Sequence, residues 1–452
     1  MNELNIFLQR FNSLLTKLPN PIPEPYWSSP VIRNSLCKWL LLAVLIRFLV
    51  MPISCYGDFI SGYHSTYQLF FENNLKIINP QNVIQGVFLY PASVIIPLKE
   101  LIGYSGFVSV PQELLQIQLA NTDIFRSLFF LKIPYLVFDI GCAVLFLNLF
   151  PEKPKTGLKA YKFWLLNPLT IYAFYIIGRF DVIAIFFILL CCYFVNTARY
   201  EYAALAIGIA IWGRYYAILL LPLFILIVAL TWKDYVKLSI LGILPLAIFD
   251  LFSFISKSTS SSEYIVASEV IAKSHFIKYI LAMNFTLDDP GMIGGIVYIF
   301  PLIFFIILIY LYIDRKNSDH LVTFSKYSLV VLLAYFVTCP FHPQFVSWFI
   351  PFLTIIYAIT ENNNLITLHC IQIIGFIIYW FRAFGGLTTD LFTPVYPDGI
   401  SALLSPYDLI NQVYSAMTIT YLGRTAISAV CIVMIIIIVK DDLMEIFQCR
   451  KN

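Results

Sequence analysis

The sequence predicts an all-α, polytopic membrane protein with about twelve transmembrane helices, within a range of roughly ten to thirteen. Of its 452 residues, 60% are hydrophobic, 17% are aromatic and only 12% are charged, whereas a soluble domain is about 25% charged. The mean hydropathy is +0.81, and a water-soluble globule could not bury that much apolar surface. The net charge of +3 is too small to indicate a nucleic-acid partner. Soluble enzymes, nucleic-acid-binding proteins, disordered chains and disulfide scaffolds are therefore excluded.

Apolar runs recur along residues 37–440, and each of them is a candidate span. The runs are 37–55, 127–150, 161–177, 182–194, 203–212, 215–230, 237–256, 293–313, 328–338, 345–360, 365–381 and 414–439. Several are shorter than the ~20 residues that a full crossing needs. The neighbouring runs 203–212 and 215–230 could form one broken helix. The predicted number of spans is therefore a range of roughly ten to thirteen.

Lysine and arginine orient these spans. With a cytoplasmic N-terminus, 17 of the 29 basic residues fall in the inside loops and tails. They are Arg10, Lys17, Arg33, Lys38, Lys153, Lys155, Lys159, Lys162, Arg199, Lys233, Lys237, Arg315, Lys316, Lys326, Lys440, Arg450 and Lys451. This asymmetry predicts cytoplasmic N- and C-termini in a multi-pass protein of the plasma membrane or of the endoplasmic reticulum membrane.

The same orientation divides the chain into three parts. Residues 1–36 form a cytoplasmic or interfacial segment, 37–440 the transmembrane domain and 441–452 a cytoplasmic tail. The external loops are 56–126, 257–291 and 382–413, and loops of that length usually carry function.

Polar residues gather at the external ends of the spans, where ionisable side chains are candidates for function. They are Asp58 after the first span, Arg179 and Asp181 between the third and fourth, Arg214 between the fifth and sixth, and His342 and Gln344 before the tenth. Structural roles remain open for some of them: Arg179 and Asp181 could simply pair with each other, and Arg214 could extend to the membrane surface. His342, between two prolines, could be a turn residue hydrogen-bonded to the backbone.

Ionisable residues also occur inside the spans. Asp139 and Arg424 could form a buried structural pair with Lys132 or Asp250. Asn167 and the proline after it predict a helix break.

The external set suits sugar transfer from a lipid phosphate. A carboxylate can take the proton from an acceptor hydroxyl, and Asp58 is the first carboxylate after the first span. The departing phosphate gains charge as the glycosidic bond breaks, and the planar forks of Arg179 and Arg214 match phosphate oxygens better than lysine does. A single displacement with one base inverts the anomeric configuration.

Five sequence motifs resemble those of one enzyme family. They are Gly57-Asp58-Phe59 after the first span, Arg126 with Lys132 and Asp139 in the second, Asn167-Pro168 followed by Gly178-Arg179-Phe180-Asp181, Gly213-Arg214-Tyr215-Tyr216, and His342-Pro343-Gln344 with Trp348 and Pro351. In this order they resemble the GT-C superfamily of membrane glycosyltransferases, and within it the mannosyltransferases that use polyprenol-phosphate mannose. The resemblance covers about residues 37–360.

The resemblance implies a hexosyltransferase, with mannose or another hexose moving from a polyprenyl-phosphate donor to a lipid- or glycan-linked acceptor on the external or lumenal face. It implies that Asp58 is the catalytic base and that Arg179, Asp181, Arg214, His342 and Gln344 bind the donor phosphate or substrate. Many members carry a second acidic residue beside the first-loop Asp, where this chain has Gly57 and Phe59. This difference leaves a divalent-cation requirement open and predicts no metal ligands, because a lone carboxylate is a poor Mg²⁺ or Mn²⁺ site.

Two other classes of function remain. A lipid or polysaccharide transporter without catalytic chemistry would place ionisable residues at mid-membrane depth and would often contain related halves. A structural subunit of a glycan-assembly complex with a degenerate site is the third class. The external clustering of the polar residues favours the enzyme.

Overall fold

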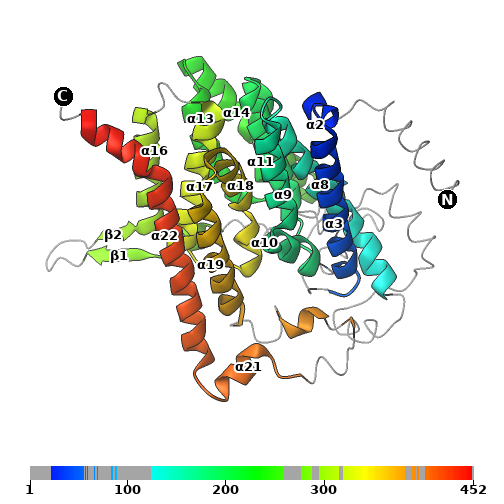
Figure 1. Cartoon of the computed structure of the whole chain (residues 1–452). Helices are drawn as coiled ribbons and strands as arrows, with labels where there is room; N and C mark the ends of the chain where they lie inside the picture. Colours follow the sequence, from blue (N-terminus) through cyan, green and yellow to red (C-terminus); the bar gives the residue numbers. More distant parts are fainter. Residues whose placement is uncertain are drawn as a thin grey trace.

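The computed structural model describes residues 22–54, 124–258, 276–287, 295–314, 319–381, 388–392, 394–395 and 403–449, with isolated positions between 56 and 88. Helices lying side by side form the body of the protein (Figure 1). Within these ranges, four helices are long and apolar enough to cross a membrane: Leu128–Leu149, His320–Thr338, Asn363–Trp380 and Ala416–Lys440. Four shorter apolar helices accompany them, at Asp181–Asn196, Tyr215–Val228, Ile299–Ile313 and Gln344–Thr360.

The first half of the chain contains α2 (Glu24–Ser28), α3 (Pro30–Val50), α8 (Ile124–Leu149), α9 (Pro154–Leu166), α10 (Pro168–Ile171), the π-helix η3 (Tyr172–Ile176), α11 (Asp181–Asn196), α12 (Tyr200–Gly213), the 3₁₀ helix η4 (Tyr215–Leu219) and α13 (Leu220–Val228). The second half contains α14 (Trp232–Ser258), β1 (Asn284–Leu287), β2 (Gly295–Tyr298), α16 (Ile299–Asp314), α17 (His320–Thr338), the 3₁₀ helix η6 (Pro343–Ser347), α18 (Ile350–Thr360), α19 (Asn363–Trp380), the 3₁₀ helix η8 (Thr389–Phe392), α21 (Pro406–Asn411) and α22 (Ala416–Cys449).

The all-α prediction is confirmed for the body of the protein, with one small exception. Strands β1 and β2 pair as an antiparallel ribbon in which Asn284 faces Tyr298 and Leu287 faces Gly295. Strand β2 occupies residues that the hydropathy pattern assigned to the start of a span at 293–313. A glycine followed by two β-branched residues favours the extended conformation over a helix there.

Helix boundaries follow local sequence signals. Helix α3 begins at Pro30, seven residues before the predicted span, because proline is favoured in a first helical turn. Helix α17 begins at His320 rather than at residue 328, because Asp319 caps it by accepting hydrogen bonds from the backbone N–H groups of Leu321 and Val322. The predicted break at Asn167 is confirmed: α9 ends at Leu166, and the Asn167 side chain caps the short helix α10.

Several helix ends meet at one end of the bundle, which we call the basic end. Lys237 near the start of α14 pairs with Glu201 at the start of α12 at 2.7 Å, and Lys159 in α9 pairs with Glu361 after α18 at 2.5 Å. The Tyr200 hydroxyl, at the start of α12, lies 2.9 Å from His320 Nδ1 at the start of α17. Because the start of α14 lies beside the start of α12, the intervening helix α13 must return to this end. Residues 203–212 and 215–230 are therefore two antiparallel segments rather than one broken helix.

Helix α17 lies at the centre of the bundle and α22 at its periphery. Of the most apolar window of each, 83% is buried in α17 and only 28% in α22. Large apolar side chains such as Phe305 of α16 and Ile436 of α22 point outward. An apolar outer surface on helices of this length indicates a helical membrane protein.

Candidate functional site

The candidate site lies at the end of the bundle opposite the basic end, where α11 begins. The preceding helix finishes as the π-helix η3, a form often found at functional sites, and the chain then turns at Gly178. Gly178 has φ = +80°, which is accessible mainly to glycine, and a Cβ there would lie 2.8 Å from the Phe59 ring. This turn places Arg179 and Asp181 at the start of α11.

Asp181 is the centre of the site, and both of its carboxylate oxygens are engaged. Arg214 Nη2 donates to Oδ2 at 2.5 Å, and Trp348 Nε1 donates to Oδ1 at 2.8 Å. Arg179 Nε also lies 3.8 Å from Oδ2. The Asp181 side chain is 0% exposed, that of Arg214 8% and that of Arg179 12%, so the two guanidinium groups and the carboxylate are largely removed from water.

Arg214 reaches Asp181 because α12 ends one residue before it. Arg214 has an extended backbone, with φ = −150° and ψ = 117°, and the 3₁₀ helix η4 follows immediately. Its guanidinium carbon lies 3.9 Å from the centre of the Phe180 ring, within cation–π range. Arg214 is therefore a buried residue of the site and not a side chain that extends to the membrane surface.

Aromatic rings form one wall of the site. Trp348 lies between Tyr216 and Phe345, and both ring pairs are stacked with centroids 4.0 Å apart. This sandwich fixes the indole so that its N–H points at Asp181. Large aromatic surfaces of this kind contribute packing as well as orientation.

His342 and Gln344 join the site through the same segment. The His342 ring centroid lies 5.5 Å from that of Phe345, and its Nε2 lies 2.9 Å from the Tyr279 hydroxyl. The described partner of Nε2 is therefore a tyrosine hydroxyl rather than a backbone group. Gln344 is 5% exposed and sits in η6, between His342 and Trp348.

Asp58, the predicted base, lies outside the described residues. Its neighbour Phe59 is described, is 3% exposed and packs against Gly178, next to Arg179. The Phe59 ring also contacts Tyr135, with centroids 6.1 Å apart. In the sequence, Asp58 therefore directly precedes a residue that packs against the Gly178 turn.

A buried lysine connects the end of α3 to the π-helix. Lys132 Nζ donates to the carbonyl oxygens of Ser54 at 2.5 Å, Tyr175 at 2.7 Å and Met51 at 3.0 Å. Lys132 is fully buried, and these carbonyls belong to segments that directly precede residues 58 and 178. These hydrogen bonds fix the backbone at the end of α3 to the backbone of η3, next to the site.

A second buried polar cluster lies deeper in the bundle. Arg47 Nε donates to Asp139 Oδ2 at 2.6 Å, and both side chains are 0% exposed. Tyr175 and Trp164 each donate to the same carboxylate at 2.7 Å. The expected pairing of Asp139 with Lys132 is wrong: its partner is Arg47, which lies 92 residues away within an apolar run, so the sequence pattern does not reveal it.

Arg424 forms no part of that cluster. Its guanidinium donates to backbone carbonyls at the end of α17, including Cys339 O at 2.8 Å, and lies over the Phe341 ring at 4.5 Å. The expected acidic partner is therefore replaced by carbonyl oxygens, which a guanidinium can bind without a second charge.

This geometry favours an anionic ligand. Two guanidinium groups approach one carboxylate, so the cluster of Arg179, Arg214 and Asp181 carries one excess positive charge in a mostly buried place. Because both Asp181 oxygens already accept hydrogen bonds, Asp181 acts as a positioning residue for Arg214 and is a poor candidate for a base. In the part of the chain that the structure describes, no three His, Cys, Asp or Glu side chains gather as a possible metal site.

Sequence reasoning missed the contribution of Trp348 and Tyr216. Both residues belong to the sequence motifs given above. The motif positions alone do not reveal that the Trp348 indole N–H donates to Asp181, which lies 167 residues away in the sequence. One signal was present in the sequence. Trp348 lies inside an apolar run, and a buried indole N–H needs a hydrogen-bond acceptor.

Comparison with family models, curated proteins and solved structures finds no significant match for this chain. The fold and the site define a helical membrane protein with a buried, positively charged cluster at one end of its bundle.

Proposed function

We propose that this protein is a membrane glycosyltransferase of the GT-C type. It transfers a hexose, mannose being the first candidate, from a polyprenyl-phosphate donor to a lipid- or glycan-linked acceptor on the external or lumenal face. The observation that carries the proposal is the convergence of Arg179 and Arg214 on the buried Asp181 at the end opposite the basic end.

The two arginines suit the leaving group of this reaction. A sugar phosphodiester carries one negative charge, and the departing phosphate carries more as the bond breaks. Guanidinium groups in a place of low water content stabilise that added charge more strongly than the ground state. Asp181, which accepts a hydrogen bond from the Trp348 indole, holds Arg214 in a fixed orientation, so little reorganisation accompanies the reaction.

Asp58 is the proposed general base. It follows the first span in the sequence and is bonded to Phe59, whose ring packs against Gly178 beside Arg179. A base on one side of the anomeric carbon and arginines around the leaving phosphate on the other give a single displacement with inversion.

The proposal includes the topology. Without the short segments α2, η8 and α21, the described helical segments number twelve when α9, α10 and η3 count as one crossing, as do η4 with α13 and η6 with α18. We propose that all twelve cross the membrane, with the basic end and both termini on the cytoplasmic side, because lysines and arginines favour that side. The arginine site then faces outward, where lipid-linked sugars are used.

The test separates binding from turnover. Purified protein in nanodiscs is incubated with radiolabelled polyprenyl-phosphate mannose and a membrane lipid extract, and binding of unlabelled polyprenyl phosphate is measured in parallel. Asp58→Asn is expected to lower transfer by about 10²–10⁴-fold while it preserves phosphate binding, because it removes only the base. Arg214→Gln is expected to weaken both.

A matched control is Asp234→Asn, which changes an exposed carboxylate at the basic end that caps α14 through Thr231. It should leave transfer close to that of the unmodified protein. Near-normal transfer by Asp58→Asn would remove that residue from the mechanism, and unchanged polyprenyl-phosphate binding by Arg214→Gln would remove the arginine site.

A transporter without catalytic chemistry is the second candidate. The observation that favours it is the Arg47–Asp139 pair, an ion pair inside the helical bundle where pathways for charged groups are found. Movement of a fluorescent polyprenyl phosphate across vesicles that contain the protein, with no transfer product, would support this reading instead.

A further inference from the structure

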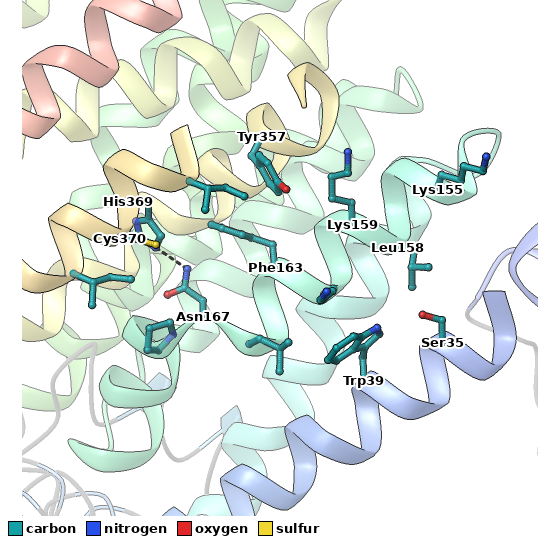
Figure 2. Close-up of a pocket in the computed structure, with 15 residues that line it drawn as sticks. Ser35, Trp39, Lys155, Leu158, Lys159, Phe163, Asn167, Tyr357, His369 and Cys370 are labelled. Atoms are coloured by element: carbon teal, nitrogen blue, oxygen red, sulfur yellow. Dashed lines mark hydrogen bonds between the residues drawn. The ribbon is translucent and has the colours of Figure 1, made fainter. Parts of the chain in front are cut away.

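A cavity lies near the basic end, between α3, α9, α18 and α19, and belongs to neither polar cluster described above. Its volume is about 610 Å³, and Figure 2 shows the side chains that surround it. Three lysines of α9 border it: Lys155, Lys159 and Lys162. Their spacing of four and three residues places them on one face of the helix.

The cavity is charged at its rim and apolar below it. Trp39 of α3 lies under Lys162, whose Nζ is 4.3 Å from the ring centroid. Further along α9 the lining becomes Phe163 and Leu166, with Ile366 and Ile373 facing them from α19. At ~1.5 Å per residue, the lysines occupy about 10 Å of α9, and the apolar lining from Ile366 to Ile373 occupies about 10 Å of α19, which is long enough for part of an acyl chain.

The floor of the cavity is polar but satisfied. Asn167 Nδ2 lies 2.9 Å from His369 Nε2, and His369 Nδ1 lies 3.1 Å from Gln372 Oε1. These groups therefore need no ligand. The rim is different: among the described residues, the ion pair of these three lysines is that of Lys159 with Glu361, whose side chain is 65% exposed.

We propose that this cavity binds an anionic phospholipid of the leaflet at the basic end, with the phosphate among the lysines and one acyl chain along the apolar part. A soluble anion would use the lysines alone and would gain nothing from the apolar channel. A neutral lipid would use the channel but not the excess charge. Only an amphipathic anion uses both, and Trp39 with Lys162 forms the kind of interfacial anchor that a headgroup contacts.

Fluorescence quenching by brominated lipids tests this assignment, because Trp39 lines the cavity. The protein is reconstituted in phosphatidylcholine bilayers that contain either brominated phosphatidylglycerol or brominated phosphatidylcholine at equal fraction. The Trp39 contribution is the difference between the unmodified protein and Trp39→Phe. Trp27 of α2, which is partly exposed at the same end and does not line this cavity, serves as the matched reporter through Trp27→Phe.

We expect quenching of Trp39, but not of Trp27, to be several-fold stronger with phosphatidylglycerol. Each lysine near an anionic lipid contributes about fivefold in affinity, so the triple variant K155Q/K159Q/K162Q should lose the preference and be quenched equally by the two lipids. The control triple R199Q/K326Q/K440Q changes the same total charge away from the cavity and should retain it. Ile366→Phe, which narrows the channel without changing charge, should also reduce quenching.

Three results would overturn the proposal. Equal quenching of Trp39 by the two lipids would remove the headgroup preference, and equal loss in both triple variants would reduce it to general surface charge. Displacement of the brominated lipid by millimolar inorganic phosphate would assign the site to a soluble anion. Retention of the preference in the control triple, with loss in K155Q/K159Q/K162Q and no effect of phosphate, supports it.

Discussion

Removal of the Asp181 charge should destabilise the protein more than removal of its partner Arg214. In Asp181→Asn, the amide can still accept from the Trp348 indole, but its NH₂ group faces the donors of Arg214. Arg214 and Arg179 then lie close together without a carboxylate. Loss of one member of a buried ion pair costs about 3–5 kcal/mol.

Arg214→Gln is expected to cost less. The glutamine can donate to Asp181, and Arg179, already 3.8 Å from the same oxygen, keeps a positive charge beside it. The loss then resembles that of one hydrogen bond to a charged group, about 1.5–3 kcal/mol. The predicted difference between the two variants is therefore roughly 1–2 kcal/mol, with Asp181→Asn the less stable.

Denaturant unfolding in mixed micelles measures this difference, and thiol-reactive dye can follow it through the buried cysteines Cys191 and Cys192. Polyprenyl phosphate provides a second measurement. A ligand present at 100 times its Kd stabilises a protein by about 2.7 kcal/mol, and at equal ligand concentration this gain should be larger for Asp181→Asn, where the arginines lack their carboxylate. An Arg214→Gln variant as unstable as Asp181→Asn would refute the view that two cations share one carboxylate.

Three further predictions concern other parts of the molecule. Trp348→Phe should keep the ring stacking but lose the N–H donor to Asp181, so we expect about 1.5–3 kcal/mol of stability loss by the same unfolding assay, against a larger loss for Trp348→Ala. Asp139→Asn should cost about 3–5 kcal/mol by leaving Arg47 buried without its counter-charge; the double variant R47M/D139L should recover most of that loss, and no recovery would contradict the ion-pair account. Glu152→Cys, in the exposed turn between α8 and α9, should react with an impermeant maleimide only after intact cells are permeabilised, and labelling from outside would reverse the proposed orientation.

Much of the fold follows from hydropathy and from local signals in the sequence. The apolar runs identify the helices because burial and a lipid environment require long apolar segments. The break at Asn167 was predictable because Pro168 cannot continue a helix without the loss of a backbone hydrogen bond. The early starts of α3 and α17 were not predictable in this way, since hydropathy windows discount polar first turns; Pro30 begins the first turn of α3, and Asp319 caps that of α17.

The candidate site was predictable in its members but not in its contacts. Arg179, Asp181 and Arg214 were found because ionisable residues at the ends of apolar runs are few. That Arg214 bonds Asp181 and that Trp348 orients the same carboxylate depends on tertiary packing across 33 and 167 residues, which no local pattern encodes. The Arg47–Asp139 pair was missed for the same reason, because each residue alone is one charge in an apolar run.

The two ends of the bundle hold their cations in different ways, and this difference bears on what each end can bind. At the basic end, Lys155 and Lys162 are exposed and flexible, so they attract an anion without fixing its geometry. At the opposite end, Arg179 and Arg214 are largely buried, and Asp181, which accepts a hydrogen bond from the Trp348 indole, holds Arg214 in place. Burial of an excess positive charge costs free energy in the unliganded protein, and an anion that enters the site offsets that cost. A fixed and partly desolvated guanidinium pair can discriminate between the charge of a bound phosphodiester and the greater charge of a departing phosphate, whereas hydrated lysines cannot. The opposite end therefore fits the sugar transfer proposed above, and the basic end fits the proposed binding of an anionic phospholipid.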